Sequence, residues 1–204
     1  MDLLATLLSL KDDKNAIFTK KTTPTICDKI LGIKIPSIKK LAKLLVLNNE
    51  YQDFLRSNHT YHEENLLHGF IIAYLPFDFN EKLLLLKEFL PLIDNWAVCD
   101  AICQAFKDFK KYPKRSFEFA KELISSKNVF YCRFGLVMLL TYFTDDFFDK
   151  SHIDLVKKIK SEEYYINMAI AWYFSVLLVK QYDYAIVVLE NKCFNQWIHN
   201  VISV

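Results

Sequence analysis

Apolar residues recur at helical spacing along most of the chain. One such stretch carries Ile38, Leu41 and Leu45, and similar stretches lie at residues 66–74 and 134–140. Apolar side chains three or four positions apart line one face of an α-helix. The strict alternation of apolar and polar residues that marks a half-buried strand is rare. The pattern therefore predicts an all-α protein.

Polar interruptions divide this pattern into short helices. They fall at residues 57–60, 75–80, 112–113, 125–128 and 144–149. Connections of this length are typical between packed helices. Only three glycines occur, and all five prolines lie before residue 114. An all-β protein would need more of both for its turns, so composition also favours helix.

Four similar apolar segments follow one another at a nearly constant interval. They open at Tyr61, Asn95, Phe130 and Tyr164, which are 34, 35 and 34 residues apart. Second, amphipathic helices of such units are expected at residues 80–90 and 114–124. The interval predicts an α-solenoid, or superhelix, of HEAT-like two-helix repeats, forming a single domain over residues 1–204 with a concave groove. An irregular helical bundle with accidental spacing is the alternative.

Charge and cysteine content place few limits on function. The formal net charge is only +2, so any contact with nucleic acid must depend on clustered charge. The five cysteines lie mostly in apolar helical patterns, and the start of the chain does not resemble a signal peptide, which favours a reduced, cytoplasmic setting. Residues 164–179 are nearly apolar but shorter than the roughly 20 residues of a membrane span. We expect a buried core helix there, no membrane contact, and a monomer.

Four residues stand out as candidates for chemistry. Asp100 and Arg133 are 33 residues apart, about one repeat, so a solenoid would place them at similar points of neighbouring units. Trp96 precedes Asp100 by four positions and shares its helix face. Trp172 follows Arg133 by 39 residues. Indole rings pack on bases or sugars, arginine binds phosphate, and a carboxylate stabilises developing positive charge. A structural ion pair between Asp100 and Arg133, with both tryptophans in the core, is the alternative.

Two lysine clusters could bind a phosphate backbone. Lys39, Lys40 and Lys43 gather on one expected helix, and Lys110 and Lys111 belong to a second cluster. A solvated helix face is the more common meaning of such runs.

Neither a metal nor a nucleotide cofactor is expected. Residues 62–68 include two histidines and two glutamates, but His62 and His68 are six positions apart, which does not bring both to one helix face. Cys99 and Cys103 have no second pair at zinc spacing, so we expect buried thiols. The chain has no P-loop, glycine-rich dinucleotide motif or nucleophile elbow.

Taken together and in order, five segments resemble the DNA alkylation repair family. They are ILGIKIPSIKKLAKLL at residues 30–45, YHEENLLHGFIIAYL, IDNWAVCDAICQAF, FYCRFGLVMLL and YYINMAIAWYFSVLLV. The family consists of HEAT-like-repeat DNA glycosylases that excise cationic N3- and N7-alkylpurines, and the resemblance covers nearly the whole chain. It implies alkylated duplex DNA as the partner and hydrolysis of an N-glycosidic bond without a cofactor.

The resemblance also assigns roles to the four candidates. The family's catalytic aspartate, four positions after a tryptophan, falls on Asp100 after Trp96. Its DNA-contacting arginine falls on Arg133 in YCRF, and its second cleft tryptophan falls on Trp172 in AIAWYF. The implied mechanism stabilises an oxocarbenium-like sugar with the aspartate, and it does not flip the base into a deep pocket.

Two departures from the family pattern leave other functions open. The family's aromatic contact before the glycine matching Gly32 has no counterpart after Phe18, and similar sequences continue beyond IHNVISV into a further basic helix. A catalytically inactive module that binds branched or damaged DNA is one alternative, and a protein-interaction scaffold is another. Exposure of Asp100 and Arg133 in a basic groove would favour DNA, and burial of this pair in the core would favour a scaffold.

Overall fold

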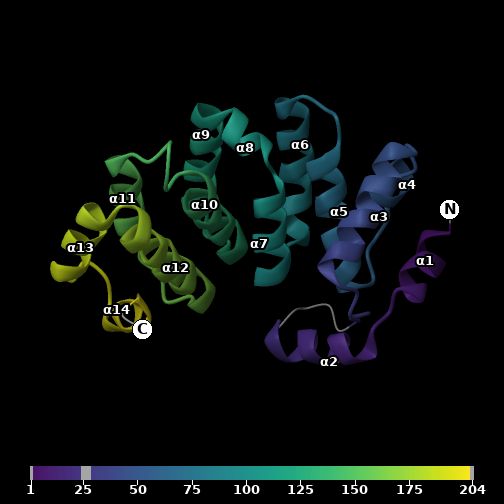
Figure 1. Ribbon diagram of the computed structural model, residues 1–204, viewed down its shortest axis with the longest axis horizontal. Helices are drawn as coiled ribbons and strands as arrows, with labels where there is room; N and C mark the ends of the chain where they lie inside the picture. Colours follow the sequence, from purple (N-terminus) through teal and green to yellow (C-terminus); the bar gives the residue numbers. More distant parts are fainter. Residues whose placement is uncertain (1, 24–28, 203–204) are drawn as a thin grey trace. The chain divides into compact units, whose positions relative to one another are not determined.

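The computed structural model describes residues 2–23 and 29–202, and every regular element in these ranges is helical (Figure 1). The all-α prediction is therefore confirmed over this part of the chain. Contacts within the chain group it into two compact units, Met1–Phe106 and Lys107–Val204. The single domain of HEAT-like repeats stays a prediction. Cys27 lies outside the described residues.

In the first unit the helices pack around a central helix, α5. The elements of this unit are α1 (Leu3–Ser9), α2 (Asp13–Thr22), α3 (Ile35–Leu47), α4 (Gln52–Arg56), α5 (His62–Tyr74), α6 (Phe79–Phe89), the 3₁₀ turn η1 (Leu90–Leu92) and α7 (Trp96–Ala105). Helix α5 packs against α3, α6 and α7 and is buried along almost its whole length. A helix buried in this way is stable only when neighbours cover its apolar side chains and its buried polar groups form hydrogen bonds.

A glycine allows α5 and α7 to approach closely. A Cβ atom built on Gly69 would lie 2.5 Å from Cγ1 of Ile102, which is closer than carbon atoms pack. Any larger residue at this position would push the two helices apart. The close packing of α7 on α5 therefore requires glycine at position 69.

One buried carboxylate organises the start of the first unit. Glu63 is 1% exposed, and its two carboxylate oxygens accept hydrogen bonds from the backbone N–H groups of Leu31 (3.0 Å), Gly32 (2.7 Å) and Ile33 (3.3 Å). Gly32 has a φ of 77°, in the left-handed region that favours glycine. A Cβ atom there would collide with the backbone nitrogen of Ala16 in α2. Glu63 thus holds the segment on which α2 packs.

The second unit is built around α10 and α12. The elements of this unit are α8 (Asp108–Lys111), α9 (Pro113–Ile124), α10 (Val129–Tyr142), α11 (Lys150–Lys157), α12 (Tyr164–Lys180), α13 (Tyr182–Glu190) and α14 (Gln196–Ile202). Helix α10 packs between α9 and α12, and α12 also contacts α13 and α14. Pro113 occupies the first position of α9, where its missing N–H costs nothing.

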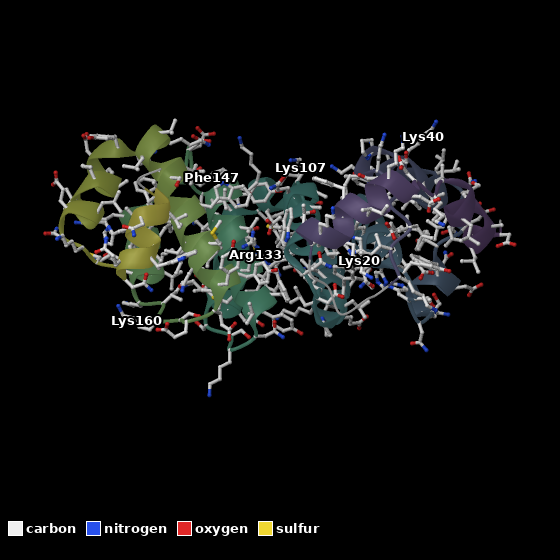
Figure 2. All side chains as sticks on the ribbon, turned by 90° about the horizontal axis from the view of Figure 1, so that it is seen from below. Lys20, Lys40, Lys107, Arg133, Phe147 and Lys160 are labelled. Carbon is white, nitrogen blue, oxygen red and sulfur yellow. The ribbon has the colours of Figure 1, made fainter. Side chains whose placement is uncertain are left out.

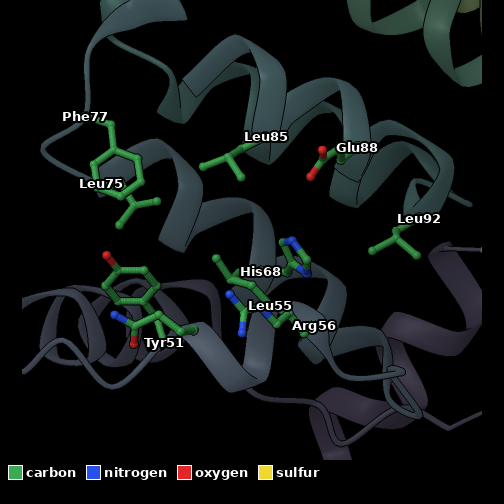
Figure 3. A pocket seen from close by; sticks show the side chains of 10 residues that line it. Tyr51, Leu55, Arg56, His68, Leu75, Phe77, Leu85, Glu88 and Leu92 are labelled. Carbon is green, nitrogen blue, oxygen red and sulfur yellow. The ribbon is translucent and has the colours of Figure 1, made fainter. Parts of the chain in front are cut away.

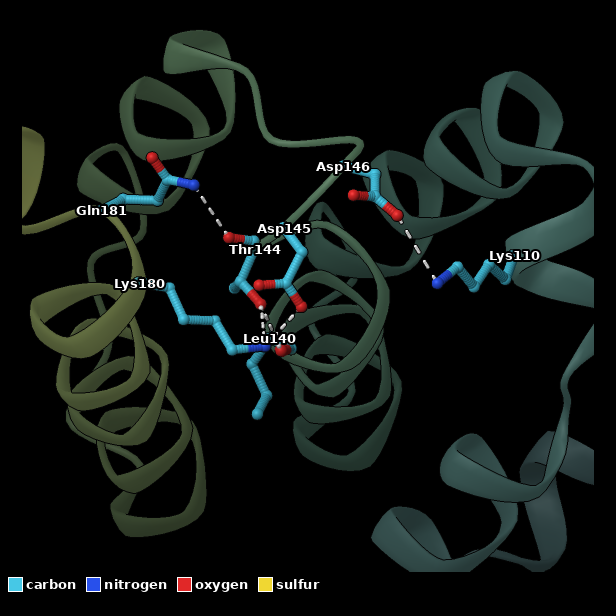
Figure 4. A network of polar contacts seen from close by, with 7 residues as sticks. All are labelled: Lys110, Leu140, Thr144, Asp145, Asp146, Lys180 and Gln181. Atoms are coloured by element: carbon cyan, nitrogen blue, oxygen red, sulfur yellow. Dashed lines mark hydrogen bonds and ion pairs between the residues drawn. The ribbon is translucent and has the colours of Figure 1, made fainter.

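A polar network fixes the end of α12 to the segment after α10 (Figure 4). The ammonium of Lys180 donates to Oγ1 of Thr144 at 3.3 Å and to Oδ2 of Asp145 at 2.6 Å. The amide of Gln181 donates to the Thr144 backbone carbonyl at 3.1 Å. The Thr144 carbonyl, just beyond the end of α10, thereby has a hydrogen-bond partner.

The four segments that open the predicted repeats all begin helices: α5, α7, α10 and α12. The side chain of Asn95 accepts from the Val98 N–H at the start of α7, and Asn128 accepts from two N–H groups at the start of α10. Asparagine is a favoured N-cap for this reason. The short helices α4 and α8 were not predicted, because four or five residues show no periodicity.

Helix α12 is the nearly apolar segment predicted to be a buried core helix. It is buried along one side, but Tyr164 is 57% exposed and Val179 is 85% exposed, so the prediction holds only in part. No helix among the described residues is long and apolar enough to cross a membrane.

The described cysteines carry free thiols. Cys99, Cys103 and Cys132 are buried, as predicted for the first two, and Cys193 is partly exposed. Burial raises the pKa of the Cys132 thiol to about 11. A thiol with so high a pKa is a poor nucleophile at neutral pH.

We predict that Glu63→Gln lowers the free energy of unfolding by about 2–3 kcal/mol, because hydrogen bonds to a charged acceptor contribute more than those to an amide. Urea denaturation measures this difference. Glu64→Gln is the matched control: Glu64 accepts from the Thr60 and Tyr61 N–H groups as part of a capping box, where glutamine serves equally well. Equal destabilisation by the two substitutions would contradict the proposed role of Glu63.

Candidate functional site

Helix α7 carries the first pair of candidate residues, Trp96 and Asp100. Trp96 is the first helical residue after the Asn95 cap, and Asp100 lies one turn further along. Asp100 is 7% exposed, whereas Trp96 is partly exposed. A carboxylate this deeply buried experiences weak solvent screening, which strengthens its interaction with any nearby positive charge.

The indole of Trp96 is tied to the end of α2. Its Nε1–H donates to the backbone carbonyl of Thr22 at 3.0 Å. Thr22 is the last residue of α2, so this carbonyl has no acceptor role within the helix. Phe18 lies one turn before Thr22 and is 63% exposed. Helix α2, whose last carbonyl accepts from the Trp96 indole, therefore carries an exposed aromatic side chain. The sequence has no further aromatic residue between Phe18 and Gly32.

The second unit carries Arg133 and Trp172. Arg133 is 6% exposed, and its Nη1 donates to the backbone carbonyl of Tyr165 at 2.8 Å. Its guanidinium carbon also lies 6.0 Å from the centre of the Tyr165 ring, and this ring contacts that of Phe130 at 5.6 Å. These contacts fix the plane of the guanidinium group and therefore the directions in which its N–H groups point.

Trp172 presents an aromatic surface on α12. It follows Tyr165 by seven residues, or two helical turns, so the two side chains share a helix face. Trp172 is 36% exposed. Neither Trp172 nor Trp96 is fully buried, and the interpretation of both tryptophans as core residues is therefore wrong.

The three lysines of the first predicted cluster differ in their surroundings. The ammonium groups of Lys39 and Lys43 lie 5.2 Å and 5.3 Å from the ring centres of Phe70 and Tyr74 in α5. Lys40 is exposed and extends outward from the first unit (Figure 2). The two aromatic rings thus keep the ammonium groups of Lys39 and Lys43 near one face of α5.

The two lysines of the second cluster pair with carboxylates. Lys110 lies 3.6 Å from Asp146, and Lys111 lies 3.2 Å from Asp108 (Figure 4 shows the first pair). The side chains of Lys110 and Lys111 are 65% and 69% exposed. Exposed ion pairs contribute about 0–1 kcal/mol. This range applies to the Lys110–Asp146 pair, in which both side chains are exposed, whereas the Asp108 carboxylate is only 18% exposed.

A basic hollow in the second unit was missed by the sequence analysis. Its volume is about 490 Å³, and three lysines and three serines contribute to its lining, together with Glu163. These lysines and serines are Lys127, Lys158, Lys160, Ser125, Ser126 and Ser161. The sequence signal was present: SSKN and KKIKSEE immediately precede the starts of α10 and α12. Lysine and serine beside helix N-termini are typical of phosphate contacts.

Residues 62–68 have structural partners in place of a metal. His62 lies 3.3 Å from the Asn95 amide, Glu63 binds backbone N–H groups, and Glu64 caps α5. Burial lowers the pKa of His62, although the charges of Glu63 and Asp94 oppose this effect. Within the described ranges, no group of three histidine, cysteine, aspartate or glutamate side chains is arranged to hold a metal ion.

The structure thus defines an all-helical protein with a tryptophan and a carboxylate on one helix and an oriented arginine on another. In a comparison with known families, residues 3–177 match the family described as DNA alkylation repair enzyme. The chain belongs to this family. Membership supports a role in the repair of alkylated DNA. None of the curated proteins compared with the chain matches it.

We predict that Trp96→Phe accelerates amide hydrogen exchange at the end of α2 about three- to tenfold, because it removes a hydrogen bond with a net contribution of about 0.5–1.5 kcal/mol. The amide of Thr23, which donates to the Thr19 carbonyl, reports this change. Trp172→Phe is the matched control and should leave α2 unaffected. Unchanged exchange in Trp96→Phe would show that the indole does not hold α2.

Proposed function

We propose that this protein is a DNA glycosylase that hydrolyses the N-glycosidic bond of cationic N3- and N7-alkylpurines. The observation that carries the proposal is the Trp96 and Asp100 pair on α7 in a chain that belongs to the DNA alkylation repair family. Asp100 is the proposed catalytic residue. Trp96, Arg133 and Trp172 are the proposed contacts to the lesion nucleotide and its backbone.

The chemistry requires stabilisation of a sugar cation. An N3- or N7-alkylpurine already carries a positive charge, so it leaves as a neutral base when the electron pair of the N-glycosidic bond moves onto the purine. The deoxyribose then becomes oxocarbenium-like. A fixed carboxylate stabilises this charge, and a water adds its oxygen to C1′ and transfers a proton to the solvent. Asp100 supplies the carboxylate, and its burial keeps solvent from screening the attraction.

The remaining residues bind the DNA in this proposal. The indoles of Trp96, which is partly exposed, and of Trp172 pack against deoxyribose, and Arg133 donates to a phosphate from an orientation that Tyr165 fixes. Phosphate contacts position a protein on DNA without reading sequence. The predicted lysines, and those of the basic hollow, serve this purpose.

We predict that the wild-type protein releases 7-methylguanine from methylated duplex DNA and that Asp100→Asn slows release about 10²- to 10³-fold, the usual cost of losing one group that stabilises transition-state charge. Chromatographic quantification of the free base measures the rate. Asp53→Asn, on the exposed surface of α4, is the matched control and should retain the wild-type rate. Undiminished release by Asp100→Asn would remove Asp100 from the mechanism.

A second candidate is a module that binds damaged or branched DNA without excising a base. Asp100 and Arg133 are both buried, 7% and 6% exposed, which weakens the case for catalysis because the carboxylate must reach the sugar. By the criterion given above, the same burial also favours the protein-interaction scaffold. Tight binding to duplex or junction DNA without base release would support this second function. The base-release assay therefore separates the two candidates.

We predict that Lys158→Ala lowers the slope of log affinity against log salt concentration for duplex DNA by about 0.9, the value for one lost phosphate contact. Lys158 lines the basic hollow at the end of α11. Lys150→Ala, at the other end of α11, is the matched control and should leave the slope unchanged. Fluorescence anisotropy at several salt concentrations measures both slopes, and identical slopes for all three proteins would exclude the hollow from the DNA interface.

A further inference from the structure

The first unit contains a cavity of about 570 Å³ that shares no residue with the proposed DNA chemistry. Side chains of α4 form one wall and side chains of α6 form the other, and His68 lies between them (Figure 3). Most of the lining is apolar, with leucines and Phe77 around a few polar groups. Cavities of this size and character are typical of small-molecule sites.

Tyr51 and His68 are the buried residues of the lining that carry a polar group, and His68 is the one that offers a ring nitrogen. It is 8% exposed, and the rings of Phe89 and His59 lie 5.1 Å and 5.0 Å from its own. Its Nδ1 lies 3.3 Å from Nε2 of His59. Its other nitrogen, Nε2, makes no hydrogen bond within the described part of the chain. Burial and the neighbouring His59 lower the pKa of His68 to about 3, so its ring is neutral at physiological pH.

A chain of hydrogen bonds determines which nitrogen of His68 carries the proton. The amide nitrogen of Asn65 donates to the Leu92 carbonyl at 3.0 Å, so the Asn65 oxygen faces Nδ1 of His59 at 2.7 Å. Since that oxygen can only accept, Nδ1 of His59 is the donor and, in the neutral ring, Nε2 is the acceptor. Nδ1 of His68 must then donate to it. Nε2 of His68 is left as an acceptor in the wall of the cavity.

The charges at the rim cancel. Arg56 and Glu88 are the charged residues of the lining. They lie on opposite walls of the cavity, and both are exposed. Neither has an ion-pair partner among the described residues. A lining with no net charge and mostly apolar walls favours an uncharged occupant over a phosphate.

We propose that this cavity binds an uncharged aromatic molecule that donates one N–H or O–H hydrogen bond to Nε2 of His68. The apolar walls enclose the ring system, and the acceptor at the cavity wall selects molecules that carry a donor. A buried acceptor without a partner costs free energy, so a ligand that lacks the donor binds less tightly.

The test uses indole and benzofuran, two bicyclic molecules of the same shape of which only indole has an N–H donor. NMR titration of the full chain at about pH 8, above the ordinary histidine pKa of ~6.5, compares their affinities. Indole should bind, with shifts confined to residues of the cavity, and benzofuran should bind about tenfold more weakly. Equal affinities, or no indole binding to the wild-type protein, would overturn the proposal.

A pair of substitutions on α6 locates the site independently. Leu85 lines the cavity, whereas its neighbour Leu84 is 64% exposed. Leu85→Trp should fill the cavity and weaken indole binding at least about tenfold, and Leu84→Trp should leave it unchanged. Circular dichroism confirms that both variants fold. Equal loss of binding in the two variants, or binding retained in Leu85→Trp, would place the indole elsewhere and overturn the proposal.

Discussion

The carboxylate of Glu63 is the interaction on which the arrangement of the first unit depends. Removing a charge from water is costly unless hydrogen bonds replace the solvent, and here three backbone N–H groups do so. They belong to one segment, residues 31–33, which must therefore curve around the carboxylate. Gly32 in this segment packs against α2, and α2 ends at the carbonyl that holds Trp96. A buried charge in α5 thus acts on the position of an indole in α7 through two intervening segments.

In the second unit, a different set of contacts fixes the orientation of a candidate residue. Arg133 is buried with its guanidinium over one aromatic ring and one of its N–H groups on a backbone carbonyl of the same residue, Tyr165. Arginine loses little conformational freedom when its planar group is held in this way. The side chain is therefore already ordered in the folded protein. The polar network at the end of α12 further fixes the helix that carries both Tyr165 and Trp172.

The helices and the identity of the family could be predicted from the sequence, because both depend on local patterns. Apolar periodicity and the repeat interval predicted the helices α5, α7, α10 and α12, and the ordered segments indicated the family. The partners of the candidate residues could not be predicted. Glu63 lies in a segment that looks like a set of metal ligands, yet its partners are backbone groups about 30 residues away. The pattern of side chains along the sequence does not show which backbone N–H groups a carboxylate will bind.

The same limit explains why the surroundings of the lysines could not be predicted. Lys39 and Lys43 look like solvated charges in the sequence, and only the packing of α3 on α5 reveals the rings beneath them. The basic hollow before α10 and α12 could have been found, since its lysines and serines recur at equivalent points of the repeat interval. His68 could not, because its role depends on the hydrogen bonds of two other side chains.

The central claim is that Asp100 stabilises the sugar cation that forms when a purine already carrying a positive charge leaves. The most direct measurement is single-turnover base release from one duplex that contains both 7-methylguanine and hypoxanthine, a purine without the positive charge. Because the protein supplies no acid to protonate the base in this account, it predicts release of 7-methylguanine alone. Release of both bases at similar rates, or of neither, would contradict it.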